Sequence, residues 1–259
     1  AAGIGVDEAD VARSAEHTAE LLRSLGVFDT VQIDRAAASD GVLGQPAVLA
    51  RRAPRHGRPT VLLYAHHDVQ PPGDDAEWSS PPFEPTVRGD RLYGRGAADD
   101  KAGVVAHVAA VRALLQVYPD PDLGIVVFIE GEEEFGSRSF AALLDRHREL
   151  LSADVIVVAD SDNWSVDTPS LTVGLRGNAT FALTVSTLAH ASHSGMFGGV
   201  VPDAMLATLS LLATLHDAEG SVAVEGLHSH DQAVPTISDE QLRADTGLLD
   251  GVQFIGRGE

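Results

Sequence analysis

Cysteine is absent from this sequence of 259 residues, and the only lysine is Lys101. Without cysteine the chain can form neither a disulfide bond nor a thiolate metal site, so any metal must be held by histidine and carboxylate side chains. No apolar run is long enough to cross a bilayer as a helix. With 44% hydrophobic residues, a soluble globular protein with a sizeable core is expected.

Basic residues are also scarce. Lysine and arginine number 18 against 38 acidic residues, which gives a formal net charge of −20 at pH 7. Such a surface repels phosphate backbones and anionic lipids, so we predict no nucleic-acid partner and no membrane partner. Most of this acidity should serve solubility, although clustered carboxylates could also hold divalent cations. The first ten residues lack the pattern of a signal peptide, and we predict a cytoplasmic location.

The first 160 residues alternate between helical and strand patterns. Apolar residues at helical spacing predict helices over residues 6–25, 101–117 and 140–151. Short apolar or β-rich runs predict strands at residues 31–33, 47–50, 60–64, 125–129 and 155–158. This alternation predicts an α/β fold with a mostly parallel sheet and flanking helices.

The pattern changes after Pro169. Residues 171–173 and 180–185 alternate like antiparallel strands, and residues 203–215 read as an apolar helix. We therefore expect two parts, a larger domain over residues 1–177 and a smaller α+β domain over residues 178–259.

Acidic and imidazole side chains cluster where the predicted strands end. Residues 66–68, 130–134 and 160–162 each follow a strand, and residues 94–101 lead into a helix. In open α/β sheets ligands bind at the carboxyl ends of the strands, so these clusters are expected to meet in space.

Each cluster alone has an ordinary structural explanation. A His-x-Asp after a strand is usually a surface turn, a glutamate run is usually a solvated face, and Asp99 with Asp100 would suit a helix N-terminus. Taken together, so much like charge at one sheet edge would destabilise the fold unless cations neutralised it.

Six motifs in order resemble the carnosinase and cytosolic nonspecific dipeptidase family, within a larger group that includes aminoacylases and succinyl-diaminopimelate desuccinylases. They are residues 66–71, 92–101, 132–137, 160, 174–177 and 193–199. The resemblance implies metal-dependent hydrolysis of dipeptides or small peptides on a zinc-peptidase-like core. It also implies that residues 1–177 are the N-terminal part of the catalytic domain and residues 178–259 part of a lid or dimerisation domain. The C-terminal part of the catalytic domain would then be absent from this chain.

The resemblance further implies two divalent metal ions per full-length subunit. His66 and Asp160 would bind one ion, Glu134 the other, and Asp99 would bridge them. Zinc is preferred, and manganese or cobalt would fit the same donors. A cis peptide bond between Asp99 and Asp100 is implied as well.

The catalytic groups come from the same resemblance. Glu133 would act as general base for a hydroxide that bridges the metals. Asp68 would orient the ring of His66, and His193 would stabilise the tetrahedral oxyanion. In dimeric relatives that histidine reaches across from the partner subunit, so we expect a homodimer.

Three alternatives stay open. An N-acyl-amino-acid deacylase would use the same metal site with a different pocket, although Gln70 and residues 193–199 favour the dipeptidase. An inactive fragment or a non-catalytic dimerisation module is a further reading. Asp162 competes with Asp160 as the metal ligand, and its position further from the strand end makes it the weaker choice.

Overall fold

The computed structural model describes residues 8–172, 174–175, 177–227 and 237–254. The chain divides into two compact units, Ala1–Leu175 and Arg176–Glu259. Within the described ranges, no helix has both the length and the apolarity that a membrane span requires. The assignment of residues 1–177 and 178–259 to a catalytic and a lid domain stays a prediction.

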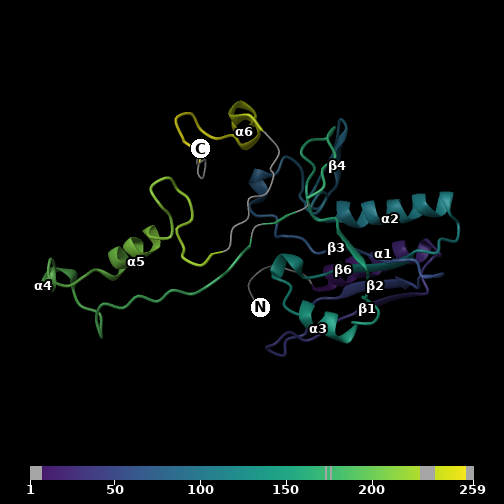
Figure 1. The fold of residues 1–259 in the computed structure, drawn as a ribbon, viewed down its shortest axis with the longest axis horizontal. Helices are drawn as coiled ribbons and strands as arrows, with labels where there is room; N and C mark the ends of the chain where they lie inside the picture. Colours follow the sequence, from purple (N-terminus) through teal and green to yellow (C-terminus); the bar gives the residue numbers. More distant parts are fainter. Residues whose placement is uncertain (1–7, 173, 176, 228–236, 255–259) are drawn as a thin grey trace. The chain divides into compact units, whose positions relative to one another are not determined.

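A five-stranded sheet forms the centre of the first unit (Figure 1). Its order is β1 (Thr30–Asp34), β2 (Ala47–Arg52), β6 (Gly124–Glu130), β3 (Thr60–His66) and β7 (Val155–Val158). The β1–β2 and β2–β6 pairs are antiparallel, whereas the β6–β3 and β3–β7 pairs are parallel. Only β2 therefore runs against the other four strands, which confirms the predicted mostly parallel sheet.

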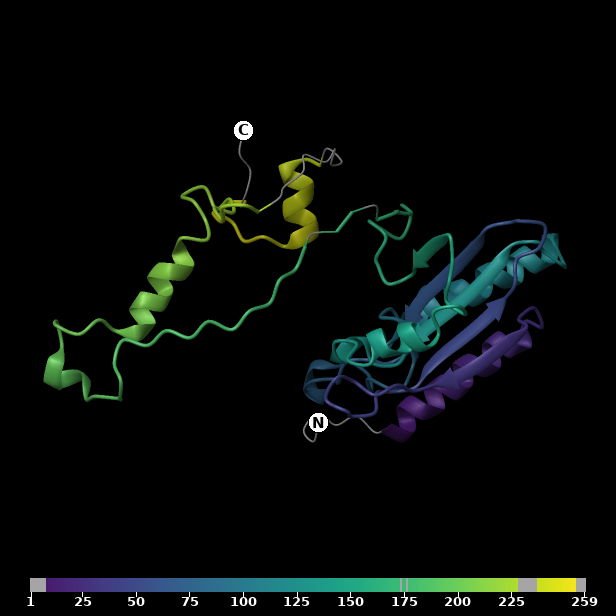
Figure 2. The ribbon, with the colours of Figure 1, turned by 60° about the horizontal axis from the view of Figure 1, so that its bottom comes forward.

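Helices cover both faces of this sheet. One face packs against α1 (Glu8–Ser24) and α2 (Lys101–Val117), and the other packs against α3 (Phe140–Arg146). Figure 2 shows α1, in purple, running along its face of the sheet. Every residue of β6 is buried, because this strand lies inside the sheet with a helix layer on each side.

The connections reverse direction at β3. Helix α2 links β3 to β6 and α3 links β6 to β7, while β6 and β7 lie on opposite sides of β3. Because parallel crossovers are right-handed, two crossovers in opposite directions place their helices on opposite faces. The carboxyl end of β3 is therefore a topological switch point, the usual ligand position in such sheets.

A small hairpin was missed by the sequence prediction. Strands β4 (Thr86–Arg88) and β5 (Arg91–Tyr93) pair around Gly89, which adopts a φ of 63°. A two-residue Gly-Asp turn between short strand-forming runs is a recognised hairpin signal, so the pattern was available in the sequence. The hairpin leads directly into residues 94–99.

One predicted helix of the first unit is clearly shorter in the structure, while the ends of the predicted strands differ from those observed by at most two residues. The helix predicted over residues 140–151 ends at Arg146, where the side chains of Arg146 and His147 both contact the Asp34 carboxylate. Residues 147–151 continue as a hydrogen-bonded turn, in which the Leu151 N–H donates to the His147 carbonyl oxygen at 2.8 Å. The first two residues predicted for α1, 6 and 7, lie outside the described residues.

The second unit contains helices α4 (Ser194–Phe197), α5 (Ala204–Ala213) and α6 (Asp239–Thr246), drawn in green to yellow in Figure 2. The prediction for residues 203–215 is confirmed as α5, and Asp203 caps it by accepting the Leu206 N–H at 2.9 Å. The strands predicted at residues 171–172 and 180–185 are wrong, since these residues form no strand, and residue 173 lies outside the described part. An alternating pattern forms a strand only beside a hydrogen-bonding neighbour, and the described residues of this unit offer one isolated bridge, between His216 and Val222.

Candidate metal centre

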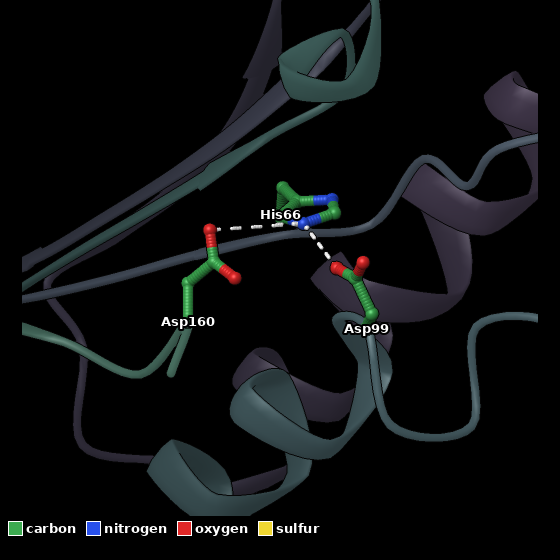
Figure 3. A group of neighbouring side chains, drawn as sticks. All are labelled: His66, Asp99 and Asp160. Atoms are coloured by element: carbon green, nitrogen blue, oxygen red, sulfur yellow. Dashed lines mark hydrogen bonds and ion pairs between the residues drawn. The ribbon is translucent and has the colours of Figure 1, made fainter. Parts of the chain in front are cut away.

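Three predicted metal ligands meet at the carboxyl end of β3 (Figure 3). His66 is the last residue of β3, Asp99 precedes α2, and Asp160 follows β7. The Nε2 atom of His66 lies 3.0 Å from Asp99 Oδ1 and 3.9 Å from Asp160 Oδ2. One ligand atom from each residue falls within 4.8 Å of the other two.

This donor set suits a divalent cation. One imidazole nitrogen and two carboxylates are the ligands that zinc, manganese and cobalt accept. His66 is buried, whereas Asp99 and Asp160 are exposed to solvent. The cluster is therefore anchored in the protein at His66 and accessible to solvent at its two carboxylates. An open side is what a catalytic metal site needs, because substrate and water must reach it.

The far side of the His66 ring faces Asp68, the residue to which the resemblance assigns the orientation of this ring. His66 Nδ1 lies 3.2 Å from the Asp68 carbonyl oxygen and 3.4 Å from its carboxylate Oδ1. Burial alone would lower the pKa of His66, but the Asp68 hydrogen bond and the surrounding carboxylates raise it to about 9. The pocket thus favours a positive charge, from a proton or from a metal ion.

The Asp68 carboxylate has a second contact that sequence reasoning did not foresee. Its two oxygens accept the backbone N–H groups of Glu133 at 3.2 Å and Glu134 at 3.0 Å. Asp68 is buried, so these bonds are shielded from water. One side chain therefore fixes both the ring of His66 and the turn that carries the predicted base and the predicted second-metal ligand.

The acidic run over residues 130–134 contains two structural carboxylates. Glu130 is buried and accepts the Tyr64 hydroxyl at 2.8 Å. Glu132 is also buried, and it accepts the Gln45 N–H at 3.0 Å and both the N–H and the hydroxyl of Ser139 at 2.5 Å. Both oxygens of Glu132 are used in these bonds, so Glu132 is not free to bind a ligand.

Glu133 and Glu134 differ from these two, because both are only partly buried. Burial raises the pKa of Glu133; the nearby His66 lowers it, while Asp160, Glu134 and Asp68 raise it further. A raised proton affinity is what a general base requires. Glu134 Oε2 accepts the Gln70 side-chain N–H at 2.8 Å, and Glu134 does not join the three-residue cluster.

The start of α2 places Asp99. The peptide bond between Asp99 and Asp100 is cis, as the resemblance implied. Asp100 caps α2 by accepting the Gly103 N–H at 3.1 Å, and its other oxygen accepts the His66 N–H at 3.1 Å. The capping role was expected from the sequence, but the bond to β3 was not.

His193 lies in the second unit, at the N-cap of α4. Its Nδ1 accepts the Gly195 N–H at 3.0 Å, so the neutral ring carries its proton on Nε2. This leaves Nε2 as a donor, the form needed to stabilise an oxyanion.

Two further residues lie outside the proposed metal site. His67, to which the resemblance assigned no role, is buried and bonds through Nε2 to the Pro46 carbonyl. Asp162 is exposed and lies outside the three-residue cluster.

Comparison with known proteins identifies relatives of this chain by sequence and by structure. A cysteinylglycine-S-conjugate dipeptidase of Corynebacterium striatum is 39% identical over 211 residues, covering 81% of this chain and 46% of that protein. A Beta-Ala-His dipeptidase of Rattus norvegicus is 33% identical over 228 residues, covering 86% of this chain and 46% of that protein. The crystal structure of human carnosine dipeptidase 1 has a TM-score of 0.54 at 27% identity, covering 91% of this chain and 50% of that one.

The chain thus spans about half the length of the curated relatives it matches. The family model described as peptidase family M20/M25/M40 matches residues 62–246, which include all seven predicted site residues and more than half of the chain. This chain belongs to peptidase family M20/M25/M40.

Proposed function

We propose that this chain is part of a metal-dependent dipeptidase. The cluster of His66, Asp99 and Asp160 carries the proposal, because it joins three metal-binding side chains at the switch point of an α/β sheet. The names of the relatives favour dipeptides as substrates, since both curated relatives described above are dipeptidases.

Two divalent ions, with zinc preferred over manganese or cobalt, would polarise the scissile carbonyl and activate the attacking water when bound. His66, Asp99 and Asp160 would hold one ion, and Asp99 with Glu134 would hold the second. Glu133 accepts a proton from the water and passes it to the leaving amine nitrogen as the peptide bond breaks.

Asp68 orients these groups and does not itself touch the substrate. Its carboxylate holds the ring of His66 and the backbone of Glu133 and Glu134, so ligand and base keep a fixed spacing. His193 is assigned to oxyanion stabilisation, because its ring Nε2 is left as a donor.

The domain assignment belongs to the same proposal. Residues 1–177 would form the N-terminal part of the catalytic domain, and residues 178–259 part of a lid or dimerisation domain. All four side chains of β7 are at least 42% exposed although all are apolar, which favours a cover from further chain or a partner. Helix α5 is similarly apolar and exposed, and we assign it to a homodimer interface.

The test is hydrolysis by the protein at its full natural length. Metal-stripped protein would be supplied with zinc, manganese or cobalt and offered Cys-Gly, β-Ala-His and a set of N-acetyl amino acids. We expect metal-dependent cleavage of at least one dipeptide and none of the N-acetyl amino acids.

Other outcomes point elsewhere. Cleavage of the N-acetyl substrates alone would identify a deacylase, and metal binding without hydrolysis of any substrate would favour a non-catalytic module. The cytoplasmic location stays a prediction, to be checked by fractionating cells that express the protein.

A further inference from the structure

Three consecutive residues at the start of α2 hold the end of β3. The Asp99 carboxylate lies 3.0 Å from His66 Nε2, and the Asp100 carboxylate accepts the His66 N–H at 3.1 Å. Lys101 Nζ donates to the His67 carbonyl oxygen at 2.7 Å. Asp100 and Lys101, which directly follow the predicted metal ligand Asp99, therefore bond to the backbone N–H of His66 and to the backbone carbonyl of His67.

The Lys101 contact is charge-assisted, which makes it stronger than a bond between neutral groups. The lysine ammonium also contacts Ser14 Oγ of α1 at 3.2 Å, and Ser14 Oγ donates to the same His67 carbonyl at 3.3 Å. Lys101 thus joins α1, β3 and α2 at one point, one residue beyond the imidazole that faces the metal site.

We propose that Lys101 is a positioning residue, which holds His66 at a fixed distance from Asp99 by anchoring the His67 carbonyl and thereby sets the metal affinity of the site. This inference rests on the proposed metal site. Without the lysine, the His67 carbonyl oxygen loses the shorter of its two side-chain bonds and keeps the Ser14 bond at 3.3 Å, so the backbone next to His66 is held less firmly and the two ligands are less well preorganised. Loss of a residue that orients a ligand typically lowers metal affinity by about 10- to 100-fold.

A purely structural role predicts something different. If Lys101 only fastens α1 to the sheet, removing Ser14 from the same junction should have the same effect as removing the lysine. If it only adds a positive charge to an acidic protein, any basic residue of α2 should be equivalent. Arg112, exposed on α2 outside this junction, provides that comparison.

The experiment uses Co²⁺ as the probe, since its visible spectrum reports on the geometry of its ligands. Affinity and spectrum would be measured for the wild type, Lys101→Met, Ser14→Ala and Arg112→Met at full natural length. We expect Lys101→Met to lower Co²⁺ affinity about 10- to 100-fold and to alter the spectrum. Arg112→Met should leave affinity and spectrum as in the wild type, and Ser14→Ala, which removes only the longer and uncharged bond to the His67 carbonyl, should lower affinity clearly less than Lys101→Met.

The opposing results are distinct. Lys101→Met matching either control would overturn the role of Lys101 and leave the metal site intact. A wild type that binds no Co²⁺ would overturn both proposals. Should Lys101→Met fail to fold, the wild-type 259-residue chain labelled with ¹⁵N-lysine decides, because it has one lysine side chain. A slowly exchanging ammonium signal that shifts on addition of Zn²⁺ supports the contact, and exchange as fast as that of free lysine contradicts it.

Discussion

Gly103 lies so close to the carbonyl oxygen of Ala159 that a methyl group on its Cα would overlap that oxygen. Gly103 is in the first turn of α2, just after Asp99, and Ala159 immediately precedes Asp160. The absence of a side chain at Gly103 therefore lets the two segments that carry Asp99 and Asp160 approach each other.

The first prediction is that Gly103→Ala destabilises the protein, although alanine is the better helix former. Overpacking costs about 1–3 kcal/mol and outweighs a propensity gain of about 1 kcal/mol. Co²⁺ affinity should fall as well, because Asp99 moves away from Asp160. The exposed Ala109→Gly on the same helix is the control, with an ordinary loss of about 1 kcal/mol and unchanged Co²⁺ binding. A Gly103→Ala variant more stable than the wild type would contradict this prediction.

The second prediction separates base from ligand. Glu133→Gln should retain metal and lose hydrolysis by about 100- to 10,000-fold, because only proton transfer is removed. Glu134→Gln should instead lower the occupancy of one metal. Elemental analysis after dialysis, alongside initial rates, measures both. Interchanged phenotypes would show that the assignment within the acidic run is displaced by one residue.

The third prediction concerns Asp68, whose carboxylate serves three donors. Asn keeps one acceptor oxygen and adds an N–H₂ group that faces a backbone N–H, so Asp68→Asn should disturb His66 and the Glu133–Glu134 turn together. We expect metal affinity to fall about 10- to 100-fold. Glu132→Gln is the matched control: it should lower the free energy of unfolding while changing metal affinity little. Equal loss of metal affinity in both variants would count against a specific role for Asp68.

The fourth prediction is a pH dependence of stability at a site remote from the metal cluster. Burial raises the pKa of Asp34, but hydrogen bonds from His147, Arg146 and the Arg35 N–H outweigh it and hold the pKa below its usual value. A depressed folded-state pKa stabilises the protein above the unfolded value near 4, and this stability is lost as pH falls through the folded pKa. Unfolding titrations should show Asp34→Asn less stable than wild type by under about 1 kcal/mol at pH 7, with a smaller difference at pH 3. A difference that is the same at both pH values would contradict this.

Much of the first unit was predictable, because its elements carry strong local signals. The predicted range of residues 101–117 equals α2, and residues 155–158 equal β7. The cluster of His66, Asp99 and Asp160 followed from motif order and from the rule that parallel strands end together. Such elements can be predicted from local sequence patterns and from the pairing of strands in the sheet, without information on other long-range contacts.

The rest depends on contacts that no local pattern encodes. The contact between Arg146 and Asp34 joins residues that are over one hundred positions apart in sequence. The hydrogen bonds from Lys101 to His67 and from Glu133 to Asp68 likewise join segments that are distant in sequence. These segments come together only when the sheet has folded. The strand predicted at residues 180–185 is wrong for the same reason. Alternation of apolar and polar residues gives a segment one apolar face, but a strand also needs a neighbouring strand to pair with.

The last prediction is that active sites are shared between two subunits. His193 lies in the second unit, while the predicted ligands and base lie in the first. Its Nε2 is left as a donor, and exposed apolar side chains of α5 follow it in the chain, so a dimer interface near this histidine would bury them. A neighbouring subunit's site would then receive the His193 donor at the substrate carbonyl, where negative charge develops during attack.

The test mixes two inactive full-length variants, His193→Ala and Glu133→Gln, under conditions that let subunits exchange. In a shared-site dimer, each mixed pair contains one site with both an intact base and an intact histidine, because the two defects fall together in the other site. Activity should therefore rise in proportion to the mixed dimers formed, towards half the wild-type rate for that population. The double variant His193→Ala/Glu133→Gln mixed with wild type is the control: its mixed dimers hold one defect in each site and should be inactive. If exchange is verified and the two single variants stay inactive together, His193 acts within its own chain and the shared-site proposal fails.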